Sequence, residues 1–420
     1  MIVKNYSRLA TSPLRRLALE LIDAGLSAIS TRKALADKVK RRANILSIAG
    51  KKFDLDKFKR VFVVGAGKVS FEAGVFLEKI LADRITDGAV IDVKGGRLKK
   101  IKSFVGDHPY PSERNIRATR EVIRILKRAG KDDLVIVIVS GGGSALLAAP
   151  QRTSGHVLRD LTQGLLREKA DIREINIARK HIPGVHGGDL AKIAYPATVA
   201  GLIFSDVPFS DLSIVASGPT FFDRTTNADA VKVLKKYNLP PVKFSETPKN
   251  RKYFKKVSNI LIVDNKTALR AMAKEAKKFG FRARIVDSYL RGEAMLAGKR
   301  MVRLAERKKS ILLFGGETTV KVSGKGKGGP NQELVLGALD FLKPNQLIVS
   351  VASDGKDNIV EAAGALADVK TKRMAKKLGL DPRQFLASND SYHFFKKTGD
   401  VIITGNTGSN VADLMIVINE

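Results

Sequence analysis

Short apolar runs that end in glycine, serine or aspartate recur along this chain of 420 residues, with helical stretches between them. The clearest run begins at Leu134, where six Val- and Ile-rich positions show no alternation before the turn Ser140-Gly141-Gly142-Gly143-Ser144. An unbroken run of this kind is typical of a strand buried on both faces of a parallel sheet. A similar run at Val61–Val64 precedes Gly65-Ala66-Gly67-Lys68 and a helix expected from about Val69 to Leu81. The succession of predicted strands and helices along the chain predicts an α/β fold.

The N-terminal region is predicted to be helical. Apolar positions between Leu14 and Leu26 fall mostly on one helical face, and a second, more basic helix is expected to reach about Leu46. Both helices are expected to pack on the sheet rather than to carry chemistry.

The length of the chain predicts two domains, because 420 residues exceed what one ordinary core contains. The segment Asn238–Asn250 has three prolines and no helical period, so we interpret it as part of a hinge. Strands and helices resume at Asn259–Val263. We therefore expect domains at 1–241 and 255–420, with a cleft between their sheets that holds the active site.

The glycine turn after the central strand favours a phosphate cradle. Gly141, Gly142 and Gly143 allow backbone N–H groups to approach an anion, and Ser144 is a good N-cap for a following helix. A tight strand-to-helix turn without a ligand is the alternative, because glycine runs also occur in unrelated turns.

The turn Gly65-Ala66-Gly67-Lys68 does not match two common nucleotide motifs. Ser70 stands where the dinucleotide fingerprint needs its third glycine, and Val69 follows the lysine where a P-loop needs Ser or Thr. Lys68 nevertheless lies at a helix start, where the dipole is already positive, an arrangement that makes sense if a phosphate shares the site. A solvated lysine fits this segment equally well.

Further charged residues lie near the expected strand ends. Arg179 and Lys180, close in sequence to His181 and His186, form a cationic cluster that could clamp a carboxylate or phosphate. Asp206 follows a predicted strand and is a candidate general base or Mg²⁺ ligand. Two prolines fix the loop that presents His108, although a lone histidine is more often structural.

The C-terminal part repeats the pattern of strand ends with polar residues. Glu317 and Asp354 each follow a buried run, and with Asp206 they are the expected Mg²⁺ ligands. The loop Gly324–Gly329 contains Lys325 and is expected to be mobile and phosphate-seeking, with a flexible hairpin connection as the alternative. Pro330 suits the first turn of a helix, which Asn331 continues.

Composition narrows the classes of partner. The chain has 75 Lys and Arg against 42 Asp and Glu, a formal net charge of +33, so its surface should attract anions. Basic residues are spread along the chain without a zinc spacing, an RNP-type strand or a basic arm, which favours anionic metabolites over specific nucleic-acid binding. The lack of cysteine excludes disulfides and thiolate catalysis and, with no signal peptide, predicts a cytoplasmic protein. No apolar run has the length of a membrane span.

Several glycine turns with lysines and carboxylates fit phosphoryl transfer from a Mg²⁺ nucleotide, because that chemistry depends on charge neutralisation and in-line positioning. The residues alone therefore indicate a kinase-like enzyme for a small anionic substrate. The oligomeric state stays open, a homo-oligomer included.

A series of motifs then adds a family resemblance. The chain resembles the glycerate 2-kinase family, whose C-terminal part is the MOFRL domain, through GAGK at Gly65, GDHPYP at Gly106, SGGGSALL at Ser140, ARKHIPGVHGGDLA at Ala178, SDVPFSDLSIVASGPT at Ser205, GGETTVKVSGKGKGGPNQE at Gly315, SDGKDN at Ser353, AAGA at Ala362 and TGNTGSN at Thr404. The resemblance implies ATP- and Mg²⁺-dependent phosphorylation of D-glycerate to 2-phosphoglycerate by a cytoplasmic enzyme. It also implies a Rossmann-like N-terminal domain, a smaller α/β C-terminal domain, and a catalytic role for Lys68.

One departure from the family pattern concerns a cation. Members commonly have Arg where this chain has Pro330, and the candidates to replace it are Lys325, Lys327 and Arg179. Combining motifs and resemblance, we expect Lys68, Asp206 and Arg179 to be catalytic. The expected nucleotide contacts are Gly65, Gly67, Gly141, Gly142, Gly143, Ser144, Lys180, Glu317, Lys325 and Asn331.

Members of this family have also been called hydroxypyruvate reductases, so an NAD(P)H-dependent oxidoreductase is the alternative function. The missing third glycine disfavours it, as does the lack of a clearly placed acidic residue for a ribose, although Asp92 lies near the required distance. A nucleic-acid-binding protein is a third hypothesis and rests only on the net charge.

Overall fold

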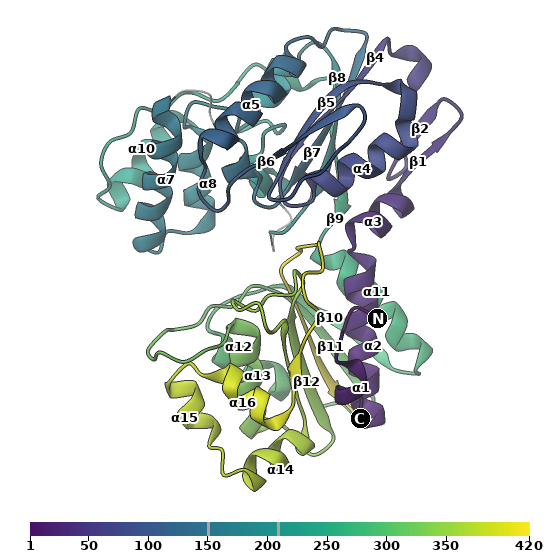
Figure 1. Cartoon of the computed structure of the whole chain (residues 1–420). Coiled ribbons are helices and arrows are strands. Elements are labelled where there is room, and N and C mark those ends of the chain that lie inside the picture. The colour runs from purple at the N-terminus through teal and green to yellow at the C-terminus, as the bar shows by residue number, and fades with distance from the viewer. Residues whose placement is uncertain (149–151, 208–210) are drawn as a thin grey trace. The chain divides into compact units, whose positions relative to one another are not determined.

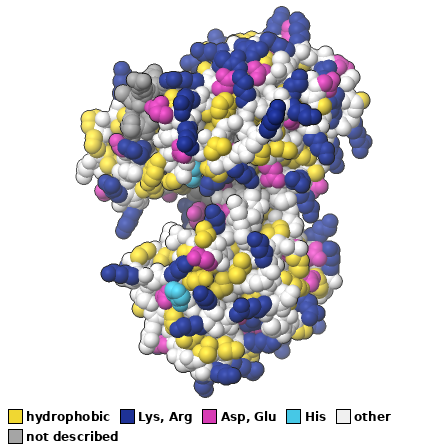
Figure 2. All heavy atoms as spheres, in the orientation of Figure 1, with side chains coloured by type: hydrophobic (Ala, Val, Ile, Leu, Met, Phe, Trp, Pro, Cys, Tyr) yellow, Lys and Arg dark blue, Asp and Glu magenta, His cyan; other side chains and the backbone are white. Residues whose placement is uncertain are grey.

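The computed structural model describes residues 1–148, 152–207 and 211–420, and the chain divides into two compact units (Figure 1). One unit is Ala34–Ile262, and the other combines Met1–Lys33 with Val263–Glu420. None of the helices described for this chain combines the length and the apolar character that a membrane span requires. On the face shown in Figure 2, lysine and arginine side chains are spread over the surface instead of gathering in one patch.

The unit Ala34–Ile262 is built on a six-stranded sheet in the order β6-β5-β4-β7-β8-β9. The pairs β6–β5, β5–β4, β4–β7 and β7–β8 are parallel. The strands are β4 (Arg60–Ala66), β5 (Ile85–Asp92), β6 (Ile101–Val105), β7 (Asp133–Ser140), β8 (Thr198–Phe204) and β9 (Val257–Val263). Since the paired strands are parallel, the residues that follow β4, β7 and β8 meet at one edge.

Helices cover this sheet and form a second small core beside it. Helix α5 packs on β5, and their side chains join the central strands in one buried cluster. Helices α7, α8 and α10 share a separate apolar cluster that includes Leu165 and Ile175. The helices are α3 (Thr31–Lys38), α4 (Ser70–Leu81), α5 (Glu113–Leu126), α6 (Gly143–Leu146), α7 (Arg152–Arg167), α8 (Ile172–Lys180), α9 (Asp189–Ala194) and α10 (Asn227–Lys236).

The helix expected up to Leu46 is wrong beyond Lys38. Strands β1 (Val39–Arg42), β2 (Ile45–Ile48) and β3 (Lys51–Asp54) form an antiparallel sheet instead. Two-residue turns join them, and in the second turn Ala49 and Gly50 both have positive φ, 46° and 89°. This is the backbone that a tight hairpin requires, so turn geometry outweighs the weak helical pattern.

The second unit contains a mixed sheet in the order β10-β11-β15-β12-β13-β14. Strand β15 is antiparallel to both β11 and β12, so the ends of β11 and β12 meet the beginning of β15 at one edge. The strands are β10 (Arg282–Leu290), β11 (Ser310–Gly316), β12 (Gln346–Ala352), β13 (Gly364–Ala367), β14 (Val401–Ile402) and β15 (Asp413–Asn419).

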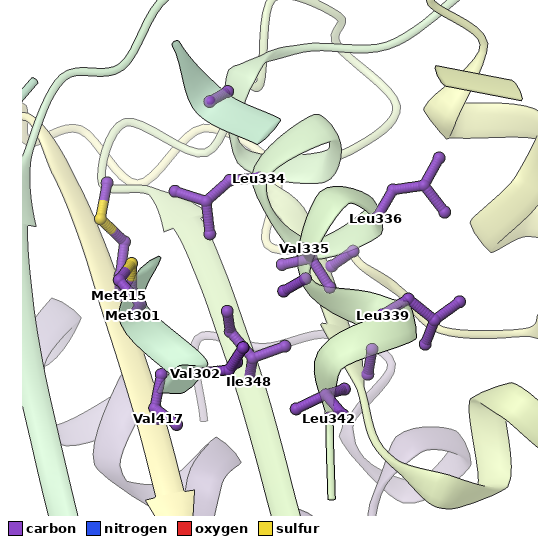
Figure 3. Close-up of a cluster of buried hydrophobic side chains, with 14 of the residues drawn as sticks. Met301, Val302, Leu334, Val335, Leu336, Leu339, Leu342, Ile348, Met415 and Val417 are labelled. Carbon is purple, nitrogen blue, oxygen red and sulfur yellow. The ribbon is translucent and has the colours of Figure 1, made fainter. Parts of the chain in front are cut away.

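Helices lie on both faces of this sheet (Figure 1). Figure 3 shows one face, where Leu334 and Val335 of α13 and Met301 of α12 pack with Ile348 and Met415 of the sheet. Helices α2 and α11 pack together on the other face. The helices are α1 (Tyr6–Leu9), α2 (Pro13–Ala28), α11 (Asn265–Lys278), α12 (Ala294–Leu304), α13 (Pro330–Ala338), α14 (Val369–Lys377), α15 (Pro382–Ala387) and α16 (Ser391–Thr398).

The division into units differs from the expected boundaries at both ends of the first domain. Met1–Lys33 join the C-terminal residues because α2 packs on α11, and because buried Arg15 bridges Asp368 and Asp400 at 2.7 Å each. Strand β9, expected to open the C-terminal domain, is an edge strand of the first sheet. The proline-rich segment Asn238–Asn250 therefore lies inside a unit, and the chain passes between units at Lys33 and again at Ile262.

Candidate active site

The unit Ala34–Ile262 has a cavity of about 210 Å³ at the edge of its sheet. Its lining includes His108, Gly141, Ser144, Asn176, Arg179 and Asp206, together with the polar residues Tyr110, Arg159 and Thr162. Gly141 follows β7 and Asp206 follows β8, so both come from the carboxyl ends of parallel strands, as the sequence predicted. Binding sites of α/β proteins lie at this edge.

Asp206 is held close to the glycine turn. A Cβ atom on Gly141 would fall 1.9 Å from Asp206 Oδ2, so only glycine leaves room for the carboxylate. Gly143 is equally constrained, since its Cβ would lie 2.6 Å from the Cβ of Ala216. These glycines allow close approach between segments of the protein, which brings Asp206 to the cavity.

Lys68 is the last residue of the turn Gly65–Lys68 and contacts the second glycine turn, which follows β7. Its backbone N–H donates to the carbonyl of Gly141 at 2.9 Å, and α4 begins two residues later with Val69 as N-cap. Gly67 has φ +130°, and a Cβ there would lie 2.0 Å from Ser140 Oγ. Gly65 packs equally tightly on β7, where its Cβ would lie 2.6 Å from the Cβ of Ile138. Gly65 and Gly67 thus join β4 to β7, and their contact with a nucleotide stays a prediction.

Arg179 presents its positive charge to the cavity. It lies near the end of α8, and its Nε donates to Thr162 Oγ1 at 3.1 Å. Burial lowers the pKa of Arg179, and no carboxylate in the described part of the chain forms an ion pair with it. A partly desolvated guanidinium without a carboxylate partner favours an anionic ligand with planar geometry.

His108 lies in the same field of positive charge. Burial, followed by the charges of Lys68 and Arg179, lowers the pKa of His108 to about 4. The imidazole is therefore neutral near pH 7 and can accept or donate a hydrogen bond without adding charge. Since both cations influence this ring, Lys68 and Arg179 act on one small region.

The cationic cluster predicted around Arg179 is separated by the structure. Lys180 Nζ lies 3.4 Å from Asp223 in a buried ion pair and is not part of the cavity lining. His181 is also buried, with Nδ1 2.9 Å from the carbonyl of Ile177. Consecutive helical residues point in different directions, so only Arg179 of this run reaches the cavity.

The predicted helix after the glycine turn is a single turn. Helix α6 has four residues, its N-cap is Gly142 with φ 80°, and Ser144 lies inside it. The prediction that Ser144 caps a helix is therefore wrong. Its hydroxyl instead lies 2.9 Å from Ser217 Oγ, and Ser144 lines the cavity.

Sequence reasoning missed Asn176, Thr162 and Ser217. Asn176 lies three residues before Arg179 on α8, a spacing that places both on one helix face and could have identified it. No local pattern identifies Thr162, which comes from the neighbouring helix α7. Ser217 enters the sequence analysis only within the motif SDVPFSDLSIVASGPT.

The second unit has its own group of acidic side chains. Glu317 and Asp354 follow β11 and β12, and Asp413 begins β15 between them. Burial raises the pKa of Asp413 well above its ordinary value, and the charges of Asp357, Glu317 and Asp354 act in the same direction. Although Glu317 is exposed, local desolvation and then Asp354 raise its pKa as well. Sequence analysis missed Asp413 because it is the first residue of its strand, whereas the predicted site residues follow theirs.

The carboxylates do not form a ready metal cage. Within residues 1–148, 152–207 and 211–420, no three or more His, Asp or Glu side chains are grouped so that they could hold a metal ion. Asp206 lies in one unit, and Glu317 and Asp354 lie in the other. Mg²⁺ commonly binds one or two carboxylates together with substrate phosphates and water, and the exposed Glu317 beside Asp354 fits that mode.

The glycine and lysine loop of this unit is fastened to the protein. Gly326 N–H donates to the carbonyl of Ser388, and the carbonyl of Lys327 accepts from Tyr392 N–H. The side chain of Lys327 pairs with Glu361, whereas Lys325 is exposed. The expected mobile loop therefore has fixed contacts, and of its two lysines Lys325 is the more accessible to an anion.

The start of α13 is organised by a buried carboxylate. Pro330 occupies the first turn, as predicted, and Asp357 accepts from the backbone N–H groups of Asn331 and Gln332 at 2.9 Å. The side chain of Asn331 also donates to Asp357 and accepts from Ser350. Asn331 is thus bonded within the protein, and its contact with a nucleotide stays a prediction.

Comparison with known proteins gives matches over almost the whole chain. Residues 17–249 match the family described as a domain of unknown function (DUF4147), and residues 310–413 match the MOFRL family. The D-glycerate 2-kinase of Thermotoga maritima is 35% identical over 96% of this chain and 98% of its own length. A Putative hydroxypyruvate reductase of Agrobacterium vitis is 36% identical over 86% of this chain and 87% of its own length.

Solved structures give the same picture. The crystal structure of glycerate kinase from Thermotoga maritima matches with a TM-score of 0.86 and 33% identity, covering 97% of this chain and 99% of that one. These similarities define a two-domain α/β enzyme of the phosphotransferase class, and confirm the predicted fold class. The chain belongs to the glycerate 2-kinase family, with a DUF4147 domain followed by a MOFRL domain.

Proposed function

We propose that the protein transfers the γ-phosphoryl group of ATP to the C2 hydroxyl of D-glycerate in a Mg²⁺-dependent reaction. Relatives named as glycerate 2-kinases support the substrate and the product. The observation that carries the proposal is Arg179, which reaches a small cavity close to Lys68 and Asp206 and, among the residues that the structure describes, forms no ion pair with a carboxylate. A small hydroxy acid supplies the missing anion and a hydroxyl group for phosphorylation.

Two residues of the cavity lining, Arg179 and Asp206, and the nearby Lys68 have roles in this proposal. The guanidinium of Arg179 binds the substrate carboxylate, since planar forks match carboxylates. The carboxylate of Asp206 accepts the proton of the C2 hydroxyl as that oxygen bonds to the γ-phosphorus. The bond from phosphorus to the bridging oxygen breaks, and the electron pair leaves with ADP. Lys68 stabilises the negative charge on the transferring group.

The acidic residues of the second unit are the proposed partners of the metal. When bound, Mg²⁺ neutralises phosphate charge. Glu317 and Asp354 would hold it together with the nucleotide phosphates, because repulsion between their carboxylates is relieved by a cation. Lys325, an exposed lysine of this unit, is proposed to contact the nucleotide.

The reductase alternative is disfavoured by Asp92. In a dinucleotide fold, an acidic residue at the end of the second strand hydrogen-bonds the ribose. Asp92 ends β5, but it is fully buried and accepts from the backbone N–H groups of Phe71 at 2.9 Å and Val93 at 2.7 Å. Its carboxylate is thus engaged in holding the start of α4, and Ser70 fills the third glycine position.

Two assays with the purified protein test the proposal. We expect ADP formation that depends on D-glycerate and Mg²⁺, with 2-phosphoglycerate identified by ³¹P NMR. Formation of 3-phosphoglycerate alone, or no use of ATP, contradicts it. NADH or NADPH consumption with hydroxypyruvate at enzyme-like rates supports the reductase alternative instead.

A further inference from the structure

A chain of hydrogen bonds connects three residues of the cavity lining, Ser144, Asn176 and Ile172, through the buried Ser217. Ser144 Oγ lies 2.9 Å from Ser217 Oγ, and Ser217 Oγ lies 3.0 Å from Asn176 Oδ1. Asn176 Nδ2 lies 2.9 Å from the carbonyl oxygen of Ile172. Ser144 and Asn176 line the cavity, whereas Ser217 is fully buried.

The direction of every hydrogen bond in this chain follows from its last acceptor, the carbonyl oxygen of Ile172. A carbonyl oxygen only accepts, so the Asn176 amide must turn its NH₂ group toward Ile172. Its oxygen Oδ1 therefore faces Ser217 and accepts the single hydroxyl proton of Ser217. Ser217 has no second proton to donate, so in its contact with Ser144 the donor must be Ser144. The proton of Ser144 points away from the cavity, and only its oxygen lone pairs face a ligand.

The backbone around Ser217 fixes this arrangement. Ala216, Ser217 and Gly218 all have positive φ, at 49°, 56° and 62°. Left-handed backbone is unfavourable for residues with a Cβ, and it normally occurs at single positions. Backbone strain of this kind persists where the surrounding structure holds it, and it often marks functional sites. Ala216 packs against the glycine turn, since a Cβ on Gly143 would lie 2.6 Å from its own Cβ.

We propose that Ser144 accepts a hydrogen bond from an alcohol group of the substrate and thereby selects hydroxy acids over oxo acids. The proposal rests on the assignment of the cavity to glycerate. It changes the role expected for Ser144, because an oxygen that offers only lone pairs repels a phosphate. Ser217 and Asn176 are positioning residues that set the direction of the Ser144 proton.

The chemistry of the two ligand classes explains the selection. With its carboxylate on Arg179, a hydroxy acid can donate its O–H to Ser144 Oγ. An oxo acid presents a carbonyl oxygen there, so two acceptors face each other without a proton. A site built for a hydroxyl donor discriminates strongly against analogues that lack it, because its polar group then stays unpaired.

The test is calorimetric binding of four small acids to the full-length protein: D-glycerate, D-lactate, 3-hydroxypropionate and pyruvate. The wild-type protein should bind at least one of the single-hydroxyl acids about tenfold more tightly than pyruvate, as expected for one hydrogen bond. Ser144→Ala should abolish this preference by weakening the binding of the hydroxy acid. Ser217→Ala should reduce it by the opposite route, because the freed Ser144 proton can then donate to pyruvate.

Ser103→Ala is the matched control, since this half-buried hydroxyl lies on β6 outside the cavity lining and has no hydrogen-bond partner among the described residues. It should bind all four acids like the wild type. If Ser217→Ala does not fold, Ser217→Gly removes the same hydroxyl from the hydrogen-bond chain and introduces a residue that tolerates positive φ. Equal binding of pyruvate and both single-hydroxyl acids by the wild type, or an unchanged preference in both serine variants, overturns the inference.

The result is separable from the proposed kinase activity. Binding is measured without ATP, so the hydroxyl preference and its loss in the variants can appear even if D-glycerate is not phosphorylated. Conversely, phosphorylation of D-glycerate with no hydroxyl preference supports the kinase and overturns the role of Ser144.

Discussion

The carboxylate of Asp206 rests on the bare backbone of Gly141, so closely that a Cβ on that glycine would fall 1.9 Å from Oδ2. The parallel neighbours β7 and β8 thus place the glycine turn and Asp206 in contact at their carboxyl ends. The turn that the sequence suggested as an anion cradle also serves to place a candidate general base.

Gly141→Ala should therefore reduce activity by displacing Asp206. A shift of about 1 Å in a reacting group can lower the rate about a hundredfold, so we expect kcat to fall by about that factor. Steady-state kinetics with D-glycerate measures the effect. Gly74→Ala in helix α4 of the same unit is the control, because the nearest atom to a Cβ there, Leu98 Cδ1, is 3.5 Å away. Equal activity of Gly141→Ala and wild type would show that Asp206 does not need this position.

Lys68→Ala should lower kcat more than it raises KM. Its ammonium is proposed to bind the transferring phosphoryl group, and loss of one such preorganised contact costs about 3 kcal/mol, or about a hundredfold in rate. Lys68→Arg should restore activity only in part, since the planar guanidinium is wider than an ammonium. Lys79→Ala, an exposed lysine on α4, is the control. A folded Lys68→Ala protein with wild-type kcat removes Lys68 from the mechanism.

Arg179→Lys should weaken glycerate binding while leaving the fold intact. In Arg179 the guanidinium can bind a carboxylate through its terminal NH₂ groups while Nε donates to Thr162. Lysine keeps the charge but cannot make both contacts. Loss of a charged hydrogen bond costs about 1.5 to 3 kcal/mol, so KM for glycerate should rise at least about tenfold. The exposed Arg167 on α7 provides the control Arg167→Lys. If KM stays the same in both variants, Arg179 does not anchor the substrate.

The sequence predicted the architecture of the site better than its contacts. Runs of mainly apolar residues identified β4, β7, β11 and β12, because strands buried on both faces are composed largely of such residues. Topology then determines that Lys68, Gly141 and Asp206 meet, since the ends of parallel strands share an edge. The positions of the apolar runs and of the residues that follow them therefore predict which residues share this edge.

Side-chain direction and long-range pairing are not contained in such patterns. Lys180 follows Arg179 directly, yet it faces Asp223, 43 positions further along the chain. The compact units differ from the expected domain boundaries for the same reason. Nothing local in Pro13–Ala28 shows that Arg15 pairs with residues more than 350 positions away.

His186 should make stability depend on pH. Burial, then the charge of Arg179, lowers its pKa to about 4. Between pH 6.5 and 4 the unfolded chain binds a proton that the folded chain does not, so stability falls as the pH falls through this window. The full effect is roughly 3 kcal/mol. His186→Gln removes it, so urea unfolding at pH 7, 5.5 and 4.5 should show the variant gaining on the wild type as pH decreases. If the unfolding free energies of variant and wild type change equally with pH, His186 is not held neutral.

Arg15→Met should destabilise the unit that contains Met1–Lys33 and Val263–Glu420. Arg15 is 5% exposed and bonds Asp368 and Asp400 at 2.7 Å each, with Thr371 as a further partner at 3.0 Å. Methionine has a similar length and apolar stem, so the main loss is the charge, and the two buried carboxylates lose their common cation. Removing one partner of a buried ion pair costs about 3 to 5 kcal/mol. The neighbouring Arg16 is exposed, so Arg16→Met controls for the loss of an arginine from α2. Chemical denaturation followed by circular dichroism measures both variants, and equal midpoints would show that Arg15 does not hold the N-terminal helix in this unit.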